Sequence, residues 1–149
     1  MKQVLHCVML AAALMAGTAT VPARADDAPA TTAAVQHHHV VFQISDSAAD
    51  RWRMLLANAK KVQETFGKQN VDIEVVALGP GIDQLRFESV LGDDINQAID
   101  NGIKIVACEN TMKAKRLTKA DMLPSIGYVP SGAVELIEKE EAGWVYLRP

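Results

Sequence analysis

Cys108 is the residue whose type and position most clearly allow chemistry. It ends the apolar run that starts at Ile103, and the segment Glu109-Asn110-Thr111-Met112 then continues as the start of a predicted helix. Backbone N–H groups in a first helical turn stabilise a thiolate. This pattern makes Cys108 a candidate reactive thiol.

Three neighbours are predicted to modulate this thiol. The helix start at Asn110 and the positive charge of Lys113 favour a thiolate, whereas the carboxylate of Glu109 disfavours a second negative charge. Because these effects oppose each other, the sequence leaves the direction of the pKa shift open. A buried, inert cysteine that acts as a small apolar residue is the alternative interpretation.

The elements that must position Cys108 alternate regularly along the chain. Short apolar runs favour buried strands, and an apolar stripe from Ala48 to Phe66 has the spacing of a helix. The predicted strands are 40–44, 71–78, 103–107, 126–129 and 144–147, and the predicted helices are 48–66, 95–100, 110–117 and 132–142. This alternation predicts an α/β fold, a three-layer α/β/α domain with a mostly parallel five-stranded sheet.

In such a sheet, ligands bind at the carboxyl ends of the strands. Ser45 and Asp46 follow the first predicted strand, and Gly79 and Gly81 follow the second, so these four residues are predicted to form a strand-end pocket. The glycines fit neither dinucleotide nor phosphate-loop spacing, which argues against a nucleotide cofactor. We expect no cofactor.

His37, His38 and His39 suggest a metal site, because imidazole is a common metal ligand. Adjacent positions do not place all three rings on one face of a strand, and no carboxylate partner is evident nearby. We therefore predict surface histidines and no metal ligand.

The N-terminal residues have the features of an export signal. Lys2 is followed by the apolar run from Val4 to Ala16 and by an A-x-A site that ends at Ala25. This run is too short to cross a bilayer, so we expect no stable membrane insertion after cleavage, and a periplasmic or secreted location. The predicted organisation is a signal peptide (1–25), a flexible leader (26–37) and one domain (38–149).

Cleavage would change both the charge and the cysteine content. The full chain has a net charge of −3, and the removed segment contains Lys2 and Arg24 but no acidic residue. The more acidic remainder argues against nucleic-acid binding. Cys7 would also be removed, which leaves Cys108 without a partner for an internal disulfide.

Several motifs resemble the DsrE-like family. These are Gly79-Pro80-Gly81, the run 102–112 that contains Cys-Glu-Asn-Thr-Met, and the segments 125–132 and 143–146. The resemblance implies a flavodoxin-like domain, assembly into trimers or hexamers, and sulfur-relay chemistry with a donor or acceptor protein. In that chemistry a cysteine carries sulfur as a persulfide, and Cys108 matches the family cysteine that follows the third strand.

Two functions follow from the sequence. The first is an exported, sulfurtransferase-like carrier that holds a persulfide on Cys108 or reacts through its thiol. The alternative is a non-catalytic oligomeric module that binds a small ligand or a protein at the same strand ends.

Overall fold

The computed structural model describes residues 36–149. The predicted signal peptide and nearly all of the predicted leader lie outside these residues. Within residues 36–149, no helix has the length and apolar character needed to cross a membrane.

The described residues form one five-stranded sheet in which every neighbouring pair is parallel, in the order β4-β3-β2-β1-β5. The strands are β1 His38–Ile44, β2 Val71–Ala77, β3 Lys104–Cys108, β4 Gly127–Val129 and β5 Val145–Leu147. The predicted α/β class and five strands are confirmed. Parallel pairing is possible because a helix returns the chain between successive strands.

The helices are α1 Ala49–Phe66, α2 Gly92–Asp100, α3 Glu109–Ala114 and α4 Gly132–Glu141, together with the 3₁₀ helices η1 Gly79–Leu85 and η2 Lys119–Asp121. Gly79 and Gly81, which follow β2, belong to η1. Ile82 and Leu85 of η1 are fully buried, which holds this segment against the core.

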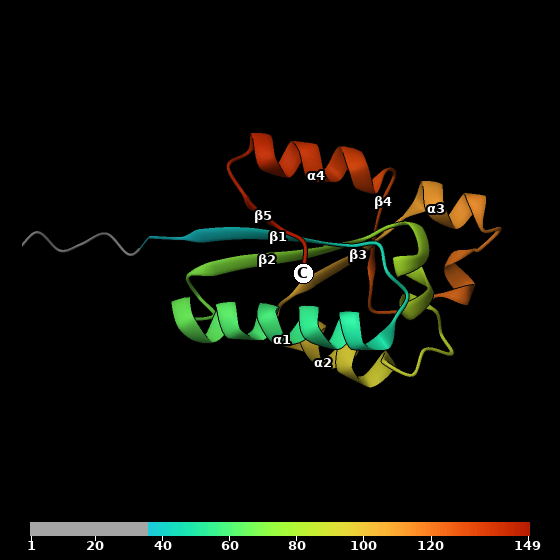
Figure 1. Ribbon diagram of the computed structural model, residues 1–149, viewed down its shortest axis with the longest axis horizontal. Helices are drawn as coiled ribbons and strands as arrows, with labels where there is room; N and C mark the ends of the chain where they lie inside the picture. Colours follow the sequence, from blue (N-terminus) through green and yellow to red (C-terminus); the bar gives the residue numbers. More distant parts are fainter. Residues whose placement is uncertain (1–35) are drawn as a thin grey trace, which may run out of the picture. The chain divides into compact units, whose positions relative to one another are not determined.

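Two layers of helices cover the sheet (Figure 1). α1 and α2 pack on one face, and α4 lies on the other. The stripe on α1 buries Trp52, Leu55 and Ala59 completely, as its helical spacing predicts. Every second residue of a strand points to the same face, so alternate positions of β3 meet α4.

The sheet face that α4 covers has an apolar part and a charged part. Its buried apolar residues, Val41, Val76, Val106, Val129 and Leu136, form a small core. Glu74 on β2 is also completely buried, and its carboxylate lies 2.8 Å from Lys139 Nζ of α4 and 2.9 Å from Lys104 Nζ of β3. This face therefore combines an apolar core with a buried ionic cluster.

Candidate functional site

Cys108 is the last residue of β3 and the N-cap residue of α3. It pairs with Val129 of β4, at the carboxyl end of the sheet. Its side chain points to the face covered by α4 and is only 5% exposed. Cys108 thus lies at a strand end, as predicted, and its side chain is buried.

Hydrogen-bond donors surround the sulfur. Burial raises the pKa of the Cys108 thiol, but the Thr111 hydroxyl and the backbone N–H groups of Gly132, Thr111 and Asn110 outweigh it, so the pKa lies below its ordinary value of 9.0. These backbone donors lie in the first turns of α3 and α4, where N–H groups stabilise a negative charge. The pKa shift of Cys108, whose direction the sequence left open, therefore favours the thiolate.

Thr111 connects the sulfur to the end of β2. Its hydroxyl oxygen accepts a hydrogen bond of 3.1 Å from the backbone N–H of Gly79. The hydroxyl proton remains available to the sulfur of Cys108, since a hydroxyl can donate and accept at once. This arrangement ties η1, α3 and β3 together at one point.

Gly132, the first residue of α4, packs directly on Cys108. A Cβ atom at Gly132 would lie 3.3 Å from the Cβ of Cys108 and 3.2 Å from both Leu78 Cβ and Val76 Cγ1. Glycine thus allows the first turn of α4 to approach the thiol. The donors come from two helices that begin at nearly the same place.

The three predicted modulating residues occupy different positions. Asn110 contributes its backbone N–H, which also donates to the carbonyl oxygen of Pro130 at 3.1 Å. Glu109 pairs with Lys119 at 3.2 Å, and Lys113 is exposed. Neither of these two side chains is among the groups that dominate the pKa of Cys108.

The predicted strand-end pocket is only partly assembled. Ser45 and Asp46 line a pocket of about 260 Å³ with Arg51 and Arg148, and neither glycine contributes to it. Gly81 instead packs against β1, where a Cβ atom would overlap the carbonyl oxygen of Ile44. Cys108 does not line this pocket, so the four residues and the thiol do not form one cavity.

No role was predicted for Thr111 or Gly132. Thr111 is the third residue of α3, a position whose side chain can turn back toward the helix start, and this spacing was the available signal. Gly132 is distant in sequence, and only the packing of α4 across β2 and β3 reveals its contact.

The sequence profile of the DsrE/DsrF-like family matches residues 37–149. No curated protein matches the chain.

Three solved structures are similar to this chain. MTH1491 of Methanobacterium thermoautotrophicum, a protein of unknown function, has 30% identity and a TM-score of 0.72, covering 75% of this chain and 99% of its own. BT1422 of Bacteroides thetaiotaomicron shares the fold, with 14% identity and a TM-score of 0.62, covering 74% of this chain and 94% of its own. The ychN protein of E. coli also shares it, with 10% identity and a TM-score of 0.61, covering 76% of this chain and 99% of its own. The profile match covers most of the sequence, and the chain therefore belongs to the DsrE/DsrF-like family.

Proposed function

We propose that this protein carries sulfur as a persulfide on Cys108. The supporting observation is the set of hydrogen-bond donors around the sulfur, which come from α3, including the Thr111 hydroxyl, and from α4. They lower the pKa of the thiol although the side chain is buried. The thiolate is the nucleophilic form of cysteine. The related sulfur-relay chemistry of the family agrees with this assignment.

The proposed step is a simple exchange. The Cys108 thiolate attacks a terminal sulfur of a polysulfide, a new S–S bond forms on Cys108, and the S–S bond in the donor breaks. The donor leaves as a polysulfide anion that is one sulfur shorter, so no external oxidant is needed. An acceptor thiolate then removes the sulfur by the reverse chemistry.

The burial of Cys108 favours a small donor. With 5% of the residue exposed, a bulky donor cannot reach the sulfur unless α4 or α3 moves. Polysulfide and thiosulfate are small, and both deliver a single sulfur atom.

The test is intact mass spectrometry after incubation with polysulfide or with thiosulfate. A wild-type chain that begins at Asp26, and so lacks Cys7, should gain the mass of one sulfur atom, and dithiothreitol should remove it. Cys108→Ser should gain nothing. An unmodified wild-type chain, or a gain that persists in Cys108→Ser, would refute the proposal.

A binding module is the second candidate, because the pocket beside Ser45 and Asp46 is separate from Cys108. Arg51 and Arg148 give this pocket positive charge, and Arg148 Nη2 donates to Ser45 Oγ at 3.2 Å. In this case small anions should raise the melting temperature equally in the wild type and in Cys108→Ser. Arg148→Ala should abolish that increase.

Export and assembly complete the proposal. A signal peptide over residues 1–25 would place the chemistry outside the cytoplasm, and N-terminal sequencing of the secreted protein tests cleavage after Ala25. Assembly into trimers or hexamers is supported by exposed apolar side chains, including Val134 and Ile137 on α4. Light scattering of the purified protein measures the subunit count.

A further inference from the structure

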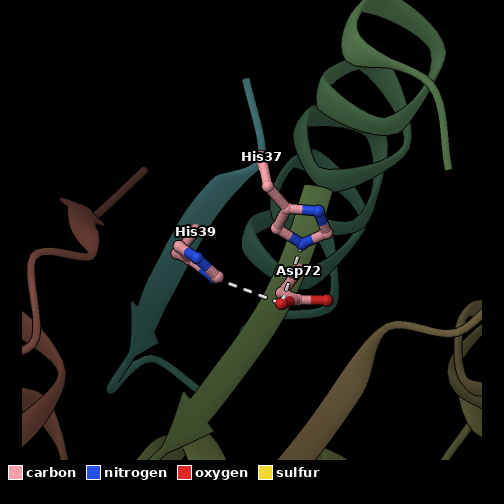
Figure 2. A group of neighbouring side chains, drawn as sticks. All are labelled: His37, His39 and Asp72. Atoms are coloured by element: carbon pink, nitrogen blue, oxygen red, sulfur yellow. Dashed lines mark hydrogen bonds and ion pairs between the residues drawn. The ribbon is translucent and has the colours of Figure 1, made fainter. Parts of the chain in front are cut away.

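The amino ends of β1 and β2 bring two imidazoles and a carboxylate together. In Figure 2 the side chains of His37 and His39 both point toward Asp72. His37 Nε2 lies 3.0 Å and His39 Nδ1 lies 3.1 Å from the same oxygen, Asp72 Oδ2. The three ligand atoms all lie within 4.8 Å of one another.

Strand register creates this cluster. His39 is directly opposite Asp72 in the parallel pair of β1 and β2, on the face that also carries Trp144. His37 precedes β1 by one residue and lies two residues from His39, which allows both rings to share a side. The sequence predicts surface histidines without a nearby carboxylate, and the structure differs because β2 supplies Asp72.

His38 is the exception in the histidine run. Its ring packs against Phe66 of α1, with centroids 4.0 Å apart, on the opposite face of the sheet. The three adjacent histidines therefore divide into a convergent pair and one residue that is turned away.

The cluster has an unsatisfied ligand atom. His39 Nδ1 is shielded from solvent and has no aligned hydrogen-bond partner, although Asp72 Oδ2 is only 3.1 Å away. A shielded polar atom without a partner is costly, and a bound ion is one explanation for it. His37 Nε2 is hydrogen-bonded to the same Asp72 oxygen, whereas His39 Nδ1 approaches that oxygen without alignment, as two ligands of one cation would.

The charges nearby do not exclude a cation. In the part of the chain that the structure describes, Asp72 pairs with the two histidines and with no lysine or arginine within 4.0 Å. On the same face, Lys104 and Lys139 are held by the buried carboxylate of Glu74. Glu135 supplies a second carboxylate, 3.6 Å from Lys139 Nζ, so the two lysine charges are compensated locally.

We propose that His37, His39 and Asp72 bind a divalent transition-metal ion, with Zn²⁺ as the best fit. Tetrahedral zinc with bonds of about 2.0–2.1 Å places its ligand atoms about 3.3–3.4 Å apart, close to the two nitrogen–oxygen distances here. Two imidazoles and one carboxylate leave a fourth position for water or another ligand.

A metal ion at this site would fix the start of β1 to the rest of the sheet. A metal bound by His37 and His39 on one segment and by Asp72 on the next would connect the start of β1 to β2. The cluster lies at the amino ends of the strands, whereas Cys108 ends β3 at the carboxyl edge. The metal proposal is therefore independent of sulfur chemistry.

Calorimetric titration with ZnCl₂ tests the proposal. The full chain is purified without a histidine tag and stripped with a chelator. We expect one zinc per chain, and an affinity at least about tenfold weaker in His39→Ala and in Asp72→Asn, since even an outer-shell change costs about 10- to 100-fold. Zinc should also raise the melting temperature of the wild type but not of Asp72→Asn.

Two controls separate this site from adventitious binding. His38→Ala should keep the wild-type affinity, because His38 faces α1, and Cys108→Ser should keep it because the thiol is not a ligand. Asp72 is exposed, so the asparagine variant should fold. The proposal is wrong if zinc fails to bind, if Asp72→Asn binds like the wild type, or if His38→Ala weakens binding as much as His39→Ala.

Discussion

The backbone N–H of Gly132 lies beside the sulfur of Cys108, and the absence of a side chain at Gly132 permits that approach. The first turn of α4 thus supplies part of the field that stabilises the thiolate. The two residues belong to different elements, so the reactivity of the thiol depends on how α4 is packed on the sheet.

Gly132→Ala should damage this arrangement. The new Cβ would contact three atoms at 3.2–3.3 Å, two of which are Cβ atoms attached directly to the backbone, so α4 or the strand ends beneath it must shift by a few tenths of an ångström. We expect a loss of about 1–3 kcal/mol in the free energy of unfolding, and slower alkylation of Cys108 at neutral pH. Urea unfolding and iodoacetamide kinetics measure the two effects.

The matched control is Gly92→Ala in α2, where the nearest contact would be an ordinary 3.6 Å to Leu123 Cδ2. This variant should alkylate at the wild-type rate. Equal rates in Gly132→Ala and the wild type would show that α4 does not set the reactivity of Cys108.

Thr111→Val should raise the pKa of Cys108. The substitution removes the hydroxyl donor and leaves the backbone N–H of Gly79 without its acceptor. A hydrogen bond to a charged group contributes about 1.5–3 kcal/mol, so the alkylation rate at neutral pH should fall by about tenfold or more. The pH profile of alkylation should move to higher pH.

Thr111→Ser keeps the hydroxyl and should retain most of the wild-type rate. If the serine variant reacts slowly and the valine variant reacts at the wild-type rate, the methyl group rather than the hydroxyl is responsible. A valine variant with an unchanged pH profile would contradict the proposed role of Thr111.

Glu109→Gln should leave the reactivity of Cys108 almost unchanged. The sequence identifies Glu109 as the neighbour that opposes thiolate formation, but its carboxylate pairs with Lys119 Nζ at 3.2 Å and is partly solvated. Solvent weakens such charges, so the alkylation rate should change by less than about twofold. A larger acceleration would show that the Glu109 carboxylate does oppose thiolate formation at Cys108.

Features that depend on residues close together in the sequence were predicted correctly, whereas contacts between distant segments were not. Buried parallel strands appear as apolar runs and α1 has a clear helical stripe, so the order of the elements and the place of Cys108 at a strand end were predictable. The contact of Gly132 with Cys108 and the pairing of His39 with Asp72 depend on packing and strand order. Neither is encoded in local spacing, so the donors around the thiol and the carboxylate beside the histidines were missed.

The buried cluster on the same face gives a further prediction. Glu74 is completely buried, and its nearest cation, Lys139, is mostly buried as well. Burial raises the pKa of Glu74, but hydrogen bonds from Lys139 and Lys104 outweigh it, so the pKa lies below 4.5. A carboxyl group whose pKa is lowered by folding stabilises the protein above pH 4.5, and this contribution is lost as the pH falls through the folded-state value.

Lys139→Met should therefore lower the free energy of unfolding by about 2–3 kcal/mol at neutral pH, somewhat less than a fully broken buried pair because Lys104 remains. The methionine keeps an apolar stem beside Trp144, over whose ring the ammonium now lies at 4.0 Å. The deficit should shrink below pH 4.5, where protonation of Glu74 removes its need for a cation. Urea unfolding across this pH range measures both effects.

The double variant Glu74→Leu with Lys139→Met should recover most of the loss, because it leaves no uncompensated charge on this pair. Lys60→Met, which changes an exposed lysine paired with Glu64 at 4.0 Å, should leave the unfolding midpoint unchanged. If the double variant is no more stable than Lys139→Met alone, packing of the Lys139 side chain, rather than charge compensation of Glu74, holds α4 on the sheet.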